Sequence, residues 1–349
     1  MRKGIIFTLM ALLAVGLLLL LLIPQQTEFG LQRQTVVRSR VQVTDDYVRD
    51  LREIYLPQTI YVTGYQTLNS LAVYTGNQSG LFPTQNSFKQ AFKEVLLNGT
   101  YRGTDINLLT QPGLYGQNLT SRLIDLQNAS KNYLFINTNF TLNYDGIDVD
   151  VYQTNLTSDG GVIGPFQVAI AVLLNYTVNI GDAYWNKSDN ITAVFSIEGL
   201  QDPLYIASTK GNKTNFIRRA NYNLSGEEAF LKFVQNSSYT YNNESPGFIQ
   251  RFYNDTNPSP DGCCGIESFV PPDVDDYFKP RGSTVINTSF VDCNYFGGVC
   301  SSRLGKAANT SWFVNIVTNA TYQFEIDQYR AFTIYYLNQS VMTQATTFP

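Results

Sequence analysis

The chain has no histidine, and only four cysteines, three methionines and two tryptophans occur among its 349 residues. The lack of histidine excludes imidazole general bases, Ser-His-Asp and Cys-His pairs, and imidazole metal ligands. Lys and Arg number 24 against 28 Asp and Glu, and no basic stripe is present, so nucleic acid is not an expected partner. A glycine-rich phosphate loop is also missing. Together these absences predict a protein that is not an enzyme.

The residue pattern present in excess is the N-linked glycosylation sequon. Eighteen Asn-x-Ser/Thr sequons occur in the chain, where roughly five are expected by chance. The acceptors are Asn77, Asn98, Asn118, Asn128, Asn139, Asn155, Asn175, Asn186, Asn190, Asn212, Asn223, Asn236, Asn243, Asn254, Asn287, Asn309, Asn319 and Asn338. A loop bias toward Asn, Ser and Thr is the alternative explanation. The set predicts a heavily N-glycosylated surface protein with no other cofactor.

The N-terminal segment from Ile5 to Ile23 is apolar throughout and contains neither charge nor proline. A helix of these 19 residues spans about 28 Å, close to the roughly 30 Å hydrocarbon core of a bilayer. Arg2 and Lys3 precede it, so we expect the N-terminus inside the cell and the head outside. A cleaved secretory signal is the alternative, although residues 24–28 offer no small-residue cleavage pattern.

Residues 31–55 contain no glycine or proline, and apolar or small residues recur there at intervals of four and three. This is the period of a helical seam. The seam consists of Val37, Val41, Thr44, Val48, Leu51 and Tyr55. It predicts a helical stalk over residues 24–56 that packs either on its own head or on neighbouring copies.

The first residues resemble the N-terminus of archaeal type IV pilin-like proteins. Arg2, Lys3 and Gly4 stand directly before the apolar segment, and Pro24 follows where many pilins have a helix-breaking proline. The resemblance implies cleavage between Gly4 and Ile5, and association of the N-terminal helices into a filament core. Leu9 departs from bacterial pilins, which have a glutamate there.

Two internal segments are similar to segments of membrane-anchored archaeal surface proteins. They are Ile197 to Tyr205, read as IEGLQDPLY, and Cys264 to Ser268, read as CGIES. This resemblance extends over most of the chain. It implies a compartment and an architecture, and it says little about activity.

The periodicity of the exterior region changes along the chain. Helical spacing predicts helices at residues 66–74, 85–97, 121–134 and 226–235, and alternation predicts strands at 134–142, 147–151, 166–178, 193–197, 312–318, 322–327 and 330–337. We therefore expect an α+β fold. In it, a long N-terminal hydrophobic and amphipathic helix precedes a mainly antiparallel, sandwich-like head with a few helices.

The predicted organisation has five parts. Residues 1–4 form a cytoplasmic or leader segment, residues 5–23 a transmembrane or filament-core helix, and residues 24–56 the helical stalk. Residues 57–133 form the helical part of the exterior region. Residues 134–349 form a β-rich, glycosylated head that contains the cysteines.

The cysteines all lie in one stretch of 38 residues, at Cys263, Cys264, Cys293 and Cys300. Two disulfides are the default outside the cell. Because adjacent cysteines rarely bond each other, we expect crossed pairs between the first two and the last two. A metal site formed by the four thiolates is the alternative, but the spacing fits no zinc ribbon or finger.

Two groups of aspartates are candidate calcium ligands. They are Asp145, Asp148 and Asp150, and Asp273, Asp275 and Asp276. Calcium requires six to eight oxygen ligands, and neither group matches an ordered loop motif. Paired carboxylates can also serve a glycosidase. The favoured interpretation is that these are solvated surface carboxylates.

Three functions are compatible with these patterns. The favoured one is a structural subunit of an extracellular, pilus-like filament that self-associates through its N-terminal helices, with glycosylated heads outward. The alternative is a monomeric membrane-anchored surface glycoprotein, such as an adhesin, an envelope component or a spike. The third is a surface hydrolase.

Overall fold

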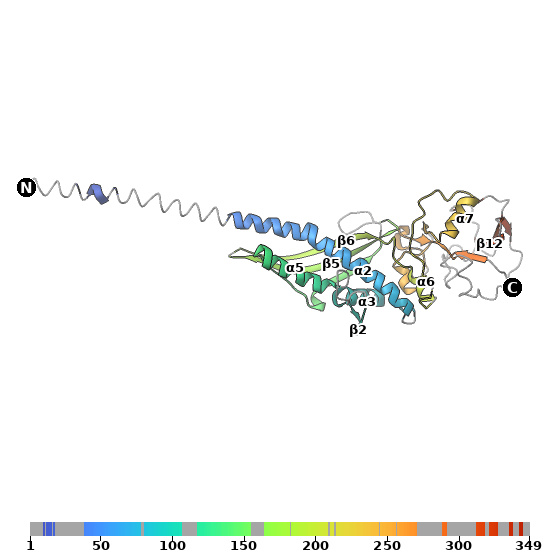
Figure 1. The fold of residues 1–349 in the computed structure, drawn as a ribbon, viewed down its shortest axis with the longest axis horizontal. Helices are drawn as coiled ribbons and strands as arrows, with labels where there is room; N and C mark the ends of the chain where they lie inside the picture. The colour runs from blue at the N-terminus through green and yellow to red at the C-terminus, as the bar shows by residue number, and fades with distance from the viewer. Residues whose placement is uncertain are drawn as a thin grey trace, which may run out of the picture.

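The computed structural model describes much of the chain between residues 38 and 270 and parts of the remainder. The described residues are 10, 12–15, 17, 38–77, 80–106, 117–154, 164–181, 183–208, 210–212, 214–243, 245–255, 257–270, 288–291, 312–317, 321–326, 335–337 and 342–344. Figure 1 shows a long helix beside the paired strands β5 and β6, with helices α6 and α7 toward the C-terminal end of the molecule.

The long helix is continuous over residues 38–77, but it contains one π-helical turn, η1 (Leu51–Tyr55), before α2 (Leu56–Asn77). On its N-terminal side the buried positions are 44, 47, 48 and 51, and on its C-terminal side they begin at 56 and 60. The interval from Leu51 to Leu56 is five residues, which is the spacing that a π-turn accommodates. The predicted seam is therefore correct at Thr44, Val48 and Leu51, but Tyr55 is 48% exposed and Leu56 takes its place.

The main sheet has four antiparallel strands: β3 (Asn137–Phe140), β4 (Asp148–Tyr152), β5 (Gln167–Ile180) and β6 (Ala183–Ser196). The long strand β5 is central. It pairs along its whole length with β6 on one side, and with β3 and β4, one after the other, on the opposite side. Alternate residues of β5, from Val168 to Val178, are buried on one face, which we call the inner face.

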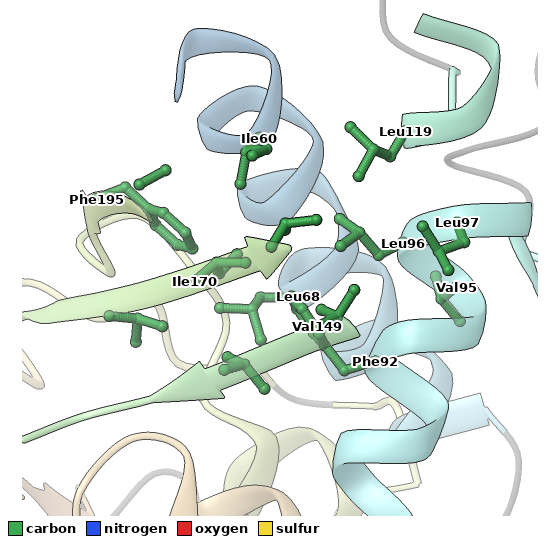
Figure 2. Close-up of a cluster of buried hydrophobic side chains, with 14 of the residues drawn as sticks. Ile60, Leu68, Phe92, Val95, Leu96, Leu97, Leu119, Val149, Ile170 and Phe195 are labelled. Atoms are coloured by element: carbon green, nitrogen blue, oxygen red, sulfur yellow. The ribbon is translucent and has the colours of Figure 1, made fainter. Parts of the chain in front are cut away.

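Helices cover the inner face of the sheet. Figure 2 shows side chains from α2, α3 (Gln85–Asn98) and α5 (Leu119–Leu134) meeting those of β4, β5 and β6 in one apolar cluster. Helix α2 approaches the sheet closely at Gly64, where an added Cβ would lie 2.1 Å from Cδ1 of Ile170. The α3 helix begins at the cap Thr84, whose hydroxyl accepts from the Ser87 amide, and ends at Gly99 in the left-handed conformation.

The remaining elements are short. They are β1 (Thr100–Tyr101), β2 (Thr104–Asp105), η2 (Tyr144–Gly146), α6 (Pro203–Ser208), α7 (Glu227–Gln235), β7 (Thr240–Tyr241), η3 (Gln250–Tyr253), η4 (Pro260–Gly262), β8 (Ile266–Glu267), β9 (Phe269–Val270), β10 (Thr288–Val291), β11 (Trp312–Val317), β12 (Thr321–Ile326) and β13 (Met342–Gln344). A second sheet has the order β13-β11-β12-β10-β9, in which β10 and β12 are parallel and the other pairs antiparallel.

The predicted fold class is wrong in two respects. First, no helix within the described ranges is long and apolar enough to cross a membrane, so the expected long apolar N-terminal helix is not found there. Second, the inner face of the main sheet packs against helices and not against another sheet, so the head is not a sandwich. Alternation of apolar residues shows that one face is buried, but it carries no information about what covers that face. The observed class is α+β, with helices and antiparallel sheets mixed.

Several elements predicted from periodicity are confirmed. The helices at 85–97, 121–134 and 226–235 appear as α3, α5 and α7, and the strands at 166–178, 312–318 and 322–327 appear as β5, β11 and β12. Strand β6 begins ten residues before the predicted strand at 193, because its first half is polar and shows no apolar alternation. Of the strand predicted at 330–337 only residues 335–337 are described, and they are not in a strand.

Candidate functional site

The outer face of the main sheet carries four glycosylation acceptors. Asn139 lies on β3, Asn175 on β5, and Asn186 and Asn190 on β6. Side chains alternate between the two faces of a strand, so the Asn and the hydroxyl residue of each sequon share the outer face. The residue between them points inward, as does Tyr176, which is 1% exposed. The prediction that Asn139 and Asn175 lie opposite an apolar face is confirmed.

These acceptors lie in neighbouring rows across the sheet. Thr177 of β5 is opposite Asn139 on one side and opposite Asn186 on the other. Leu173 of β5 is opposite Asn190. Neighbouring strands are about 4.8 Å apart, so sugars on these acceptors would lie next to one another over the outer face.

The other acceptors with described side chains are also accessible to solvent. Those that are exposed are Asn98, Asn128, Asn212, Asn223, Asn236, Asn243 and Asn254, and Asn118 is half-buried. The acceptors Asn155, Asn287, Asn309, Asn319 and Asn338 lie outside the described residues, and of Asn77 only the backbone is described. The geometry thus permits modification at each acceptor whose side chain is described, while its occupancy stays a prediction.

Three acceptors also hold local structure through their side-chain oxygen. The Oδ1 atom of Asn118 accepts from the Ser121 amide at 2.8 Å and caps α5. The Oδ1 atom of Asn223 accepts from the Ser225 amide at 3.1 Å, and that of Asn139 accepts from Gln127 Nε2 at 3.5 Å. A sugar is attached to Nδ2, so these hydrogen bonds and glycosylation are compatible.

A groove of about 750 Å³ lies beside Asn190 on the outer face. Its floor includes Ala171, Leu173 and Asn190, and its far side includes Asp148 of β4. Another wall is formed by Gly247, Ile249, Gln250, Tyr253, Ser259 and Pro260, together with the first turns of α3. The groove is therefore bounded by the sheet, by one helix and by a loop distant in sequence.

The first group of candidate calcium ligands does not converge. Asp145 lies in the turn η2, while Asp150 pairs with Lys89, whose Nζ is 2.5 Å from its Oδ1. An ammonium group at this distance competes with a metal ion for the carboxylate. No group of three or more metal-ligating side chains occurs among the residues with described positions. Asp273, Asp275 and Asp276 lie outside them.

A buried ion pair joins Arg251 and Asp202. The Arg251 guanidinium donates from Nη1 to Asp202 Oδ2 at 2.7 Å and from Nη2 to the Ile266 carbonyl at 2.5 Å. Asp202 also accepts from the Tyr239 hydroxyl at 2.8 Å and from the Leu204 amide at 2.9 Å. Both charged side chains are 0% exposed. Several donors on the carboxylate offset part of its loss of hydration.

A second buried carboxylate belongs to Glu267. Its Oε2 accepts from Asn242 Nδ2 at 2.7 Å and from the Ser245 hydroxyl at 2.9 Å, and its Oε1 accepts from the Tyr335 hydroxyl at 2.7 Å. These donors come from two separate parts of the chain, the loop that contains Asn242 and Ser245 and the region of Tyr335. The hydrogen bonds therefore tie β8 to the loop around residue 243 and to the C-terminal region.

The segments Ile197 to Tyr205 and Cys264 to Ser268 meet at these buried groups. Asp202 belongs to the first segment and Glu267 to the second. The Tyr205 and Ser268 hydroxyls, 3.0 Å apart, connect the segments directly, and Arg251 bridges them through its two hydrogen bonds. Because these groups are closed to solvent, their arrangement indicates a structural role.

The cysteine pairing differs from the expected crossed pairs. The structure joins the adjacent residues Cys263 and Cys264 in a disulfide. Cys264 is buried, and the Tyr241 hydroxyl donates to the neighbouring Gly262 carbonyl at 2.7 Å. Cys293 and Cys300 lie outside the described residues.

The predicted cleavage site, Gly4 and Ile5, also lies outside the described residues. Within the apolar segment the described residues 10, 12–15 and 17 are helical. Their large apolar side chains are well exposed, from 55% at Leu17 to 75% at Leu12.

No family model matches the chain, and neither a curated protein nor a solved structure does. The resemblance to archaeal pilin-like surface proteins therefore remains an expectation.

Sequence reasoning did not identify Arg251 or the groove. Arg251 is the single charged residue in the run Phe248 to Phe252, which otherwise contains three apolar residues and Gln250. A single charge in an apolar run is a signal for a buried ion pair, and it could have been noticed. The groove had no comparable signal, because its walls come from distant parts of the chain.

Proposed function

We propose that this chain is a glycosylated structural subunit of an extracellular assembly on the cell surface, with a pilus-like filament as its form. In this proposal, copies associate along the helix 38–77 and the outer face of the main sheet is turned away from the axis. The sugars then cover the outside of the assembly.

The observation that carries the proposal is the uneven distribution of acceptors over the molecule. Four acceptors lie on the outer face of the sheet, and residues 1–76 contain none. The helix that covers the inner face carries its one acceptor, Asn77, at its last residue. Residues 38–76 of this helix thus have one side on the apolar core and another side without an acceptor. A surface that must contact another protein chain cannot carry large glycans, and this helix meets that condition.

The exposed side of the helix also carries apolar residues. Val43, Ile54, Tyr55, Tyr61 and Val62, which we call the helix stripe, are between 39% and 54% exposed. Ile54 and Tyr61 are seven residues apart, as are Tyr55 and Val62, so each pair lies on one side of the helix. The π-turn contributes to this arrangement, because it displaces Tyr55 from the core position that the seam would otherwise give it.

The N-terminal apolar segment supports the same proposal. The exposed side chains at positions 10, 12, 13, 15 and 17 require cover by lipid or by copies of the chain. We assign this segment to the membrane before assembly and to contacts between copies afterwards. Cleavage between Gly4 and Ile5 is part of this proposal.

The experiment compares charged substitutions in the helix stripe with one elsewhere. Ile54→Asp combined with Tyr61→Asp should abolish assembly, seen as loss of filaments by electron microscopy and as monomers in detergent by light scattering. Tyr133 on α5 is 81% exposed and lies outside the stripe, so Tyr133→Asp is the matched control and should assemble normally. Assembly by the double variant, or a native protein that is monomeric in detergent, would contradict the proposal and favour an anchored monomeric glycoprotein.

A further inference from the structure

The groove on the outer face has a glycosylation acceptor in its own lining. We propose that the sugar attached to Asn190 folds back onto the sheet and packs its first rings over Leu173, in the groove lined by β4 and by residues of the segments 247–253 and 259–260. This inference rests on the proposed function, because it requires an N-linked glycan at Asn190. It adds that one glycan is a structural part of the fold.

The strand register brings the necessary groups into one row. Asp148 of β4 is opposite Leu173 of β5, which is in turn opposite Asn190 of β6. With strands about 4.8 Å apart, Asn190 and Asp148 are separated by about 10 Å across Leu173. A sugar that extends from Asn190 toward β4 must therefore cross Leu173.

The chemistry of this row suits a sugar ring. A pyranose has apolar C–H groups on its faces and hydroxyl groups around its edge. Leu173 is 37% exposed and, with Ala171, provides an apolar floor. The Asp148 carboxylate has no side-chain hydrogen bond or ion pair among the described residues. It is thus an available acceptor for sugar hydroxyls at the far side of the groove.

The wall of the groove is held in place by the protein itself. Gln153, next to β4, accepts from the Ile249 amide at 3.0 Å and donates to the Gln167 carbonyl at 2.9 Å. Gln250 accepts from the Gly247 amide at 2.8 Å. Because these bonds fix residues 247–250 against the sheet, little ordering is needed when a sugar packs there. Covalent attachment at Asn190 keeps the sugar at a high effective concentration beside the groove.

Asn186, on the same strand, provides the comparison. It is exposed on the same outer face, but Thr177 stands opposite it in place of a leucine, and it does not line the groove. Among the described residues that line the groove, Asn190 is the single sequon acceptor. The two positions differ in the floor that their sugars would meet.

The test is amide hydrogen exchange of residues 247–253 in the full-length glycoprotein, after glycopeptide mass spectrometry has established which acceptors carry sugar. We expect Asn190→Gln to accelerate exchange about five-fold, the effect of uncovering the exposed part of one leucine side chain. Asn186→Gln should leave exchange in this segment unchanged. Leu173→Thr keeps the sequon but removes the apolar floor, and it should also accelerate exchange about five-fold. This second variant tests the inference if Asn190→Gln does not fold.

Three outcomes would overturn the inference. If Asn190 carries no sugar while Asn186 does, the groove is not a glycan site and the proposed function is unaffected. If Asn190 is modified but its removal changes exchange no more than removal of Asn186, its sugar extends into solvent. If no acceptor is modified, the inference and the glycosylated subunit fail together.

Discussion

The Arg251 guanidinium lies 2.7 Å from the Asp202 carboxylate, and both side chains are completely buried. This pair joins η3 to the loop that precedes α6, and through the Ile266 carbonyl it reaches β8. This charged contact thereby connects three short elements that do not pair with one another in a sheet. The pair is therefore expected to matter more for stability than an ion pair at the surface.

The first prediction is that Arg251→Met destabilises the protein by about 3 to 5 kcal/mol, because Asp202 keeps a buried charge without its partner. The free energy of unfolding is measured by urea denaturation. Arg49→Met is the control, since Arg49 pairs with Asp46 at the exposed surface and its loss should cost less than about 1 kcal/mol. Equal effects of the two substitutions would show that the buried pair has no special role.

The second prediction concerns the close contact of Gly64 with Ile170. Gly64→Ala adds helix propensity worth up to about 1 kcal/mol, but its Cβ would lie 2.1 Å from Ile170 Cδ1. The steric clash should outweigh the gain in helix propensity and lower the free energy of unfolding by about 1 to 3 kcal/mol. The double variant Gly64→Ala with Ile170→Val, which removes Cδ1, should recover part of the loss. If Gly64→Ala alone stabilises the protein, the helix is not seated on the sheet as described.

The third prediction is a loss of stability at high pH. Burial, with a contribution from Asp255, raises the pKa of Tyr253 from 10.0 to about 12. The folded state therefore favours the protonated phenol. The contribution of the protonated Tyr253 phenol to the free energy of unfolding is fully present below about pH 10, and it is lost as the pH rises toward about 12. Tyr253→Phe should flatten the pH dependence of unfolding in this range, measured by urea denaturation at several pH values. An unchanged slope would contradict the assignment.

The fourth prediction is that sugars on the outer face act together. Single Asn→Gln changes at Asn139, Asn175 or Asn186 should be nearly silent, because neighbouring glycans cover the same surface. Removing all three should increase aggregation, measured by light scattering, without changing the circular dichroism spectrum. Asn137 and Asn179 lie opposite each other on this face without being acceptors. Changing both to Gln is the control, and aggregation of the control to the same extent would exclude the sugars as its cause.

The sequence predicted those parts of the fold in which one face is buried over a long run. The alternation from Phe166 to Val178 was sufficient to predict β5, and the helical seam was correct at Thr44, Val48 and Leu51 but not at Val41, which is 37% exposed. The π-turn after Leu51 was not predictable from the seam, because an inserted residue changes which side faces the core without changing local propensity. The sandwich was predicted because alternation does not distinguish a covering sheet from covering helices.

The candidate site could be predicted in part. The positions of the sequons, and the placement of Asn139 and Asn175 on the face opposite the apolar one, follow directly from the sequence. The row from Asp148 to Asn190 depends on the register of β4 and β6 with β5, and the polar first half of β6 shows no pattern from which that register could be read. The pairing of Cys263 with Cys264 was missed because such a bond is rare.

In the proposed assembly, copies associate through the helix stripe while the sugars on β3, β5 and β6 face outward. Electron cryo-microscopy of the assembled glycoprotein can show both features in one structure. We expect subunit contacts at Ile54 and Tyr61, and sugar density at Asn139, Asn175, Asn186 and Asn190 on the outside of the assembly. A subunit interface formed by the outer face of the sheet, with these acceptors unmodified, would contradict it.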